Sequence, residues 1–287
     1  MNCCTLCAVR FSPNFHYMKS MLRLIAPLIT ICLSACFSSK HIQHPPQHTN
    51  PATGTSFYKT AAAFNWNQRD SLFLELFRNG SVPTSYYHFK KIHYIYTDSL
   101  GASHHLNFFA ANDYAMIGSP TDWARVPLTP IAAQIMADSI NCFLPTRKLV
   151  DIIHQQSKVK LEPVPMYAYR DSTVTMWQHH LIIEGQRKGR KGMISGIKKD
   201  IVLCSLNALK DKQNRVAIYG WYKTDGKAIQ PLYTGHVNWY ADYSHGARMI
   251  YRKLKVDGKW MDYTSILKDP LLRNALSDEK GEMMLRY

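Results

Sequence analysis

One stretch near the C-terminal end of the chain, YADYSHGARMI at positions 240–250, is dense in side chains that can transfer protons. His245 lies in this stretch, and His236 lies nine positions before it. Gly246 permits a sharp turn or a left-handed backbone, which would project His245 out of a strand. Histidine has an ordinary pKa near neutral pH, and a carboxylate can orient an imidazole. We therefore predict acid–base work by His245 and His236, with Asp242 orienting them. The alternative is a polar hairpin tip whose histidines bind only backbone groups.

Four further residues, three of them beside His245, are candidate contacts for a substrate. Arg248 lies three positions after His245, and its permanent positive charge suits an anionic substrate group. Tyr243 and Ser244 directly precede His245, and Lys199 stands where a loop enters a predicted strand and would bind an anion. The alternative for Lys199 is an exposed lysine at the start of a strand.

Cys142 is the candidate nucleophile, because it lies just ahead of a predicted helix at 146–157. Unpaired N–H groups at a helix N-terminus stabilise a thiolate and lower the pKa of the thiol. A cysteine at a helix start with a histidine on a later strand is the order found in papain-like folds. The cell-wall amidases of the NlpC/P60 group have this order, and the chain resembles them in the order of cysteine and histidine but in no local motif. The alternative is a small buried side chain, which we also expect for Cys204.

The segment SHGAR at 244–248 resembles the catalytic stretch of L,D-transpeptidases, in which Ser-His-Gly-Cys is followed one residue later by Arg. Here Ala247 occupies the position of the nucleophile and Arg248 comes one residue early, so the resemblance implies no transpeptidase activity. The tail from GWYKTDGKAIQP at 220–231 through SHGAR looks like a group of uncharacterised secreted bacterial proteins, which implies no mechanism.

No metal site or cofactor is predicted from the histidines. The helical H-E-x-x-H pair of many zinc enzymes is missing from the sequence. His179 and His180 are adjacent in a predicted helix, where neighbouring side chains do not face one site.

An apolar run of twelve residues, LIAPLITICLSA at 24–35, follows a short basic segment. It is too short for a membrane-spanning helix, which needs about 20 residues, and it suits the apolar region of a secretory signal.

Leu33-Ser34-Ala35-Cys36 resembles the lipobox of bacterial lipoproteins. The resemblance implies that residues 1–35 are upstream residues and a signal peptide. It also implies that a lipid on Cys36 holds the protein to a membrane of the cell envelope, at the outer membrane or the cell surface. The alternative is an ordinary signal peptide.

The rest of the chain predicts a tether at 36–55 and a single domain at 56–287. The tether is rich in Pro, Ser, Thr, His and Gln, which favour a flexible chain. Apolar periodicity, caps and turn signals predict a helix at 67–79 and three central helices. The central helices lie at 130–140, at 146–157 and in a later segment that breaks at Gly189. Hairpins are predicted on either side, with turns near 98–101, at Asp225-Gly226 and at Asp257-Gly258. Central helices flanked by antiparallel β-hairpins define an α+β fold.

The formal net charge is +15, of which Arg10, Lys19 and Arg23 supply three, so +12 remains from Cys36 onward. In an envelope protein this charge favours anionic headgroups or acidic polymers over nucleic acid. We therefore predict a hydrolase acting on peptidoglycan or another anionic envelope polymer. The alternative is a non-catalytic binding or scaffold lipoprotein that uses a basic loop at 185–199 and surface aromatics, the candidates being Trp221, Tyr222, Trp239, Tyr240 and Tyr243.

Overall fold

A seven-stranded sheet forms one side of the fold in the computed structural model, which describes residues 39–210 and 212–287. Four of its strands are β1 (Ser39–His41), β2 (His88–Thr97), β3 (Ser103–Ala110) and β13 (Ile250–Tyr251). β6 (Cys142–Phe143) pairs with β13, while β14 (Lys253–Val256) pairs with β3 and with β15 (Lys259–Asp262). The predicted hairpins at 98–101 and Asp257-Gly258 are therefore both part of this sheet. The predicted signal peptide and Cys36 lie outside the described residues.

A second sheet of four strands carries the candidate site. Its order is β11 (Ala228–Tyr233), β10 (Ile218–Tyr222), β9 (Lys199–Ile201) and β12 (His245–Gly246). β10 and β11 form the hairpin predicted around Asp225-Gly226, and β12 runs parallel to β9 with His245 opposite Lys199. Two smaller sheets pair β4 (Met116–Gly118) with β5 (Trp123–Arg125) and β7 (Val159–Lys160) with β8 (Ile194–Ser195).

The central helices begin at polar caps that the sequence supplies. Asn65 caps α3 (Trp66–Arg78) and Thr129 caps α4 (Pro130–Ser139), in which Pro130 takes the first helical position. The other helices are α5 (Arg147–Gln156), capped by Thr146, and α6 (Thr173–Arg187), capped by Ser172. Shorter helical segments are α2 (Gly54–Thr60), η1 (Ala61–Ala63), η2 (Thr84–Tyr87), α7 (Leu206–Leu209), α8 (Tyr263–Lys268) and α9 (Arg273–Leu276).

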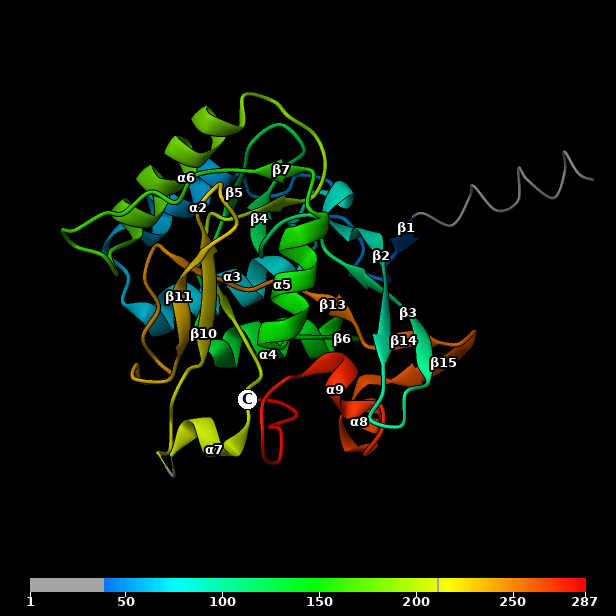
Figure 1. The fold of residues 1–287 in the computed structure, drawn as a ribbon. Helices are drawn as coiled ribbons and strands as arrows, with labels where there is room; N and C mark the ends of the chain where they lie inside the picture. Colours follow the sequence, from blue (N-terminus) through cyan, green and yellow to red (C-terminus); the bar gives the residue numbers. More distant parts are fainter. Residues whose placement is uncertain (1–38, 211) are drawn as a thin grey trace, which may run out of the picture. The chain divides into compact units, whose positions relative to one another are not determined.

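The fold is α+β, as predicted, with helices between two sets of strands. In Figure 1, α4 and α5 lie between β10 and β11 on the left and β2, β3, β14 and β15 on the right. α5 contacts both β2 and β10, so one helix face packs toward each sheet. Residues 39–287 form one compact unit. Within the described part of the chain, no helix combines the length and the apolar character that a membrane crossing requires.

Residues 39–55 do not form the flexible tether that their composition predicts. β1 pairs antiparallel with β2, and the side chain of Ile42 is only 1% exposed in the main core. His44 stacks on the ring of Tyr87, with centroids 4.1 Å apart. The amide of Gln47 donates to the carbonyl of Val82 at 2.6 Å. Backbone pairing and one buried isoleucine thus outweigh the polar composition of this segment.

Ile42→Ala is expected to lower the free energy of unfolding by about 2–4 kcal/mol, because it leaves a cavity under β1. Equilibrium denaturation in urea, followed by circular dichroism, measures the change. Gln43→Ala is the matched control, because the side chain of Gln43 is next to Ile42 in sequence but exposed, so its removal leaves the core intact. An equal effect of the two substitutions would show that Ile42 does not fasten this segment to the domain.

Candidate functional site

The stretch 240–250 is not an exposed hairpin tip. Every residue from Ala241 to Ile250 is buried, and His245 and Gly246 form β12 beside β9. Gly246 does not adopt the left-handed backbone that the sequence allowed. A Cβ atom on Gly246 would come within 2.5 Å of the ring of Tyr114, so glycine is needed here for close packing.

The structure brings the two predicted acid–base histidines together. The ring centroids of His236 and His245 are 5.9 Å apart. The ring of Tyr240 contacts both, at 4.6 Å from His236 and 5.7 Å from His245. His245 is completely buried and His236 half-buried. Among the described residues, neither ring nitrogen of His245 has a hydrogen-bond partner.

Asp242 does not orient His245 as predicted, because its carboxylate is held by other groups. One oxygen accepts hydrogen bonds from the Ser244 N–H at 2.8 Å and the Ser244 hydroxyl at 2.6 Å. The other accepts from the Arg170 guanidinium at 3.1 Å and the Tyr240 hydroxyl at 3.3 Å. The two hydrogen bonds from Ser244 close a small ring, as an Asx turn does. An aspartate two residues before a serine, as in Asp242 and Ser244, is the sequence pattern that predicts this turn.

Burial and neighbouring charges set the protonation of this cluster. Burial lowers the pKa of His245 to about 4, against the attraction of Asp242, so the imidazole is neutral at neutral pH. Burial would raise the pKa of Asp242, but positive charge nearby and the hydrogen bonds from Ser244 bring it down to about 2. Burial also lowers the pKa of His236. The cluster therefore pairs a neutral, unbonded imidazole with an ionised carboxylate.

The predicted substrate contacts at 243, 244 and 248 are interior structural groups. Arg248 is 1% exposed and donates to the carbonyls of Ala111 and Ile194, each at 2.7 Å. The Tyr243 hydroxyl accepts a hydrogen bond from the Met166 N–H at 2.7 Å, and the Ser244 hydroxyl donates to the carboxylate of Asp242. Buried polar groups must find partners inside the protein, and these residues do so with backbone and neighbouring carboxylate groups.

Lys199 is also buried rather than exposed at a strand start. Its ammonium lies over the ring of Trp221, 4.9 Å from the centroid, and burial lowers its pKa. Its neighbour Lys198 is more deeply enclosed, donates to the carbonyl of Tyr243 and lies 3.3 Å from Nδ1 of His179. Burial lowers the pKa of Lys198 to about 7. Two consecutive lysines, Lys198 just before β9 and Lys199 at its start, are thus buried, which the sequence alone did not reveal.

Cys142 does not have the activated thiol that was predicted. It lies in β6 of the seven-stranded sheet, while Thr146 caps the next helix. Its sulfur donates to the carbonyl of Ile140 at 3.4 Å, and burial raises the pKa of the thiol well above its ordinary value. The alternative of a small buried side chain describes Cys142, and Cys204 is buried as predicted.

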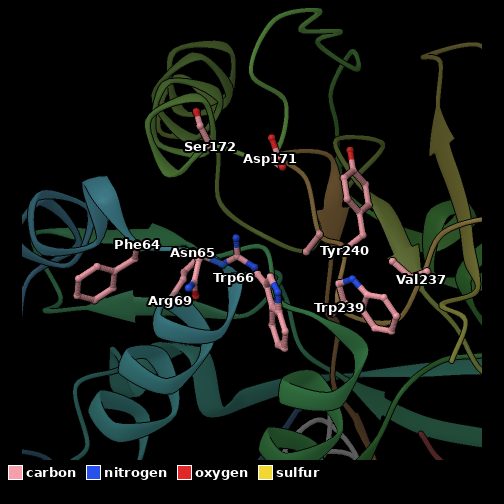
Figure 2. A pocket seen from close by; sticks show the side chains of 10 residues that line it. Phe64, Asn65, Trp66, Arg69, Asp171, Ser172, Val237, Trp239 and Tyr240 are labelled. Atoms are coloured by element: carbon pink, nitrogen blue, oxygen red, sulfur yellow. The ribbon is translucent and has the colours of Figure 1, made fainter.

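A pocket of 370 Å³ opens beside the histidine cluster and is shared by three separate segments. Its walls come from the start of α3, the start of α6 and the loop between β11 and β12. The lining residues are Phe64, Asn65, Trp66, Arg69, Asp171, Ser172, Val237, Trp239, Tyr240 and Ala241. Figure 2 shows Trp66 and Trp239 low in the view and Asp171 and Ser172 above them.

Two exposed tryptophans line this pocket. Trp66 is 41% exposed and Trp239 is 44% exposed, although tryptophan usually buries most of its surface. Arg69 is 1% exposed, and its guanidinium donates to Asp70 at 3.2 Å. Trp239 and Tyr240 were among the predicted surface aromatics, but Trp66, Arg69 and Asp171 were missed. The one local signal was a tryptophan directly after the cap of a helix, on its exposed side.

Tyr240 connects the pocket to the histidine cluster. Its ring lines the pocket and contacts both His236 and His245, and its hydroxyl donates to Asp242.

Within residues 39–210 and 212–287, no three His, Cys, Asp or Glu side chains gather closely enough to hold a metal ion. The chain matches no protein-family model, and comparisons with curated proteins and with solved structures found no match either.

Proposed function

We propose that this protein is a lipid-anchored envelope protein that binds saccharide chains of peptidoglycan or a similar polymer. The observation that carries the proposal is the pocket flanked by Trp66 and Trp239, both more than two-fifths exposed. Large, rigid aromatic rings supply apolar contact area at low entropic cost, and they suit the C–H faces of sugar rings. A tryptophan pair left exposed beside a concave surface is typical of a binding site rather than a core.

Polar groups around the indoles suit hydroxyl and acetamido substituents. Asn65 offers an amide at the rim, because only its carbonyl oxygen is used in capping α3. Asp171 adds a carboxylate, and Figure 2 places it across the pocket from the indoles. A few polar groups in a partly apolar pocket fix the orientation of a ligand and supply specificity.

The burial of the predicted catalytic groups favours binding over cleavage. His245 and Asp242 are each 0% exposed, and Cys142 is a core thiol. A general base must lie within hydrogen-bond reach of the proton that it abstracts. Placement at the envelope rests on the lipobox at 33–36, and the net charge of +12 that remains from Cys36 onward suits an anionic polymer.

A hydrolase is the second candidate, favoured by the convergence of His236, His245 and Asp242 behind Tyr240. In that case Tyr240 would swing away and the neutral imidazole of His245 would accept a proton from an attacking water. The unbonded nitrogens of His245 support this candidate, because a buried imidazole without partners is costly.

Pelleting with purified cell-wall sacculi tests the proposal. Trp66→Ala and Trp239→Ala are each expected to weaken binding about tenfold, since each removes apolar contact worth about 1–2 kcal/mol. Trp260→Ala is the matched control, because this tryptophan is 49% exposed but lies in β15 of the other sheet.

Two outcomes of the same incubation are decisive against the binding proposal. Equal losses for all three tryptophan variants would show that the pocket does not hold the polymer. Soluble fragments released by the wild type but not by His245→Ala, identified by mass spectrometry, would replace binding with hydrolysis.

A further inference from the structure

One face of the seven-stranded sheet points away from the core and is basic. Leu254 and Val256 of β14 are buried, so alternation along the strand places Lys253 and Lys255 on the opposite face. Trp260 of β15 pairs with Lys255 and therefore shares that face. The indole of Trp260 is 49% exposed.

Neighbouring strands continue the same surface. Phe109 of β3 stacks beside Trp260, with ring centroids 6.3 Å apart, and its partner across the β2–β3 ladder is Lys91. From β1, the ammonium of Lys40 lies 4.4 Å from the ring centroid of Tyr251 and 5.9 Å from that of Trp260. We call the set Lys40, Lys91, Lys253, Lys255 and Trp260 the basic sheet face.

The acidic and titratable neighbours leave this face positive. Asp262 pairs with Lys253 across β14 and β15, but the guanidinium of Arg252 holds its carboxylate at 2.5 Å. Asp257, at the end of the hairpin, is bound to His104 at 2.7 Å. His93 and His105 also lie on this face, with ring nitrogens 3.4 Å apart, and neither side chain brings a negative charge to it.

We propose that the basic sheet face docks on the headgroups of an anionic phospholipid bilayer. The proposal rests in part on the proposed lipid anchor, because Cys36 is only three residues before Ser39 of β1. Three residues span at most roughly 10 Å, so a lipid on Cys36 would hold the edge strand of this sheet near the membrane surface.

The chemistry of the face suits a bilayer interface. Lysines near an anionic leaflet are attracted to it, and tryptophan prefers the level of the headgroups. Lys40, Lys91, Lys253 and Lys255 come from three strands around one exposed indole, which makes a broad surface rather than a pocket. A sheet surface of like charge complements a continuous anionic layer better than it does a compact ligand.

Partition into vesicles tests the docking surface. The full chain carrying Cys36→Ser is mixed with limiting phosphatidylcholine vesicles, with or without phosphatidylglycerol, and the ratio of the two bound fractions is measured. Lys91→Gln, Lys253→Gln and Lys255→Gln together are expected to lower this ratio about tenfold or more. All variants share the apolar segment 24–35, so its own affinity for lipid cancels in the ratio.

The matched control combines Lys158→Gln, Lys191→Gln and Lys223→Gln, three exposed lysines outside this sheet, and is expected to keep the wild-type ratio. Equal losses in both triple variants would overturn the proposal, because binding would then follow net charge alone. A wild-type ratio near one would also overturn it.

The result is separable from the proposed function. Trp66→Ala should leave the vesicle ratio unchanged, and the triple variant of the sheet should still pellet with sacculi. Mass spectrometry of the wild-type protein from cells reports independently whether Cys36 carries lipid.

Discussion

Replacing Arg125 with methionine is expected to lower the free energy of unfolding by about 3–5 kcal/mol. The guanidinium is 1% exposed and donates to both carboxylate oxygens of Asp113, each at 2.7 Å. It also donates to Glu184 at 2.7 Å. Burial would raise the pKa of Asp113, but Arg125 holds it below its usual value. Without Arg125, the buried carboxylate must stay charged without its main partner or take up a proton.

Equilibrium denaturation in urea measures this loss, and Arg286→Met provides the matched control. Arg286 makes a similar ion pair with Asp138 at 2.9 Å, but its side chain is 67% exposed, so its loss should cost less than about 1 kcal/mol. A double variant with Asp113→Leu should recover part of the stability, because no unpaired carboxylate then remains. A similar small effect for both arginines would contradict the account of a buried ion pair.

Stability is expected to fall as the pH drops from about 7 to about 5, by up to about 2 kcal/mol for each buried neutral histidine. Burial lowers the pKa of His154 and His245 to about 4 and that of His180 to about 3, from an ordinary value of 6.5. The unfolded chain therefore takes up protons before the folded protein does. The stabilisation is complete above pH 6.5 and is lost as the pH falls toward 4.

Two buried acids oppose this trend. Burial raises the pKa of Asp200 to about 7 and also raises the pKa of Asp70, so the folded protein binds these protons before the unfolded chain does and gains stability as the pH falls. The buried histidines outnumber these two carboxyl groups, and the net slope should still favour neutral pH. Thermal melting across this pH range measures the slope.

His154→Phe should flatten the pH dependence, because phenylalanine can keep the stack on Tyr222, whose ring lies 3.9 Å from the imidazole. His48→Gln, at an exposed position, should leave the dependence unchanged. A slope of opposite sign in the wild-type protein would contradict the claim that the buried neutral histidines dominate the pH dependence.

Local signals predicted the elements well, for physical reasons that operate within a few residues. Thr129 followed by Pro130 fixes a helix start, and Asp257-Gly258 fixes a two-residue turn. The helix predicted at 67–79 forms at 66–78, where Asn65 supplies the cap. The α+β class followed from the order of these elements along the chain.

The site was less predictable because its geometry depends on contacts between distant segments. His236 and His245 do come together, but burial of the whole 241–250 stretch depends on β9 and Tyr114. The same cause explains Arg248, whose guanidinium binds carbonyls that lie more than fifty residues away. The pocket around Trp66 and Trp239 joins segments near 65, 171 and 240, which share no local pattern.

The central claim is that a saccharide chain occupies the pocket between Trp66 and Trp239. Hydrogen–deuterium exchange with soluble glycan fragments prepared from sacculi tests it most directly, because it locates the contact in the unmodified chain. We expect slower exchange at 64–69, 171–172 and 237–241 when fragments are present, with β10 and β11 unchanged. Unchanged exchange in those three segments, together with protection elsewhere on the protein, would contradict the claim.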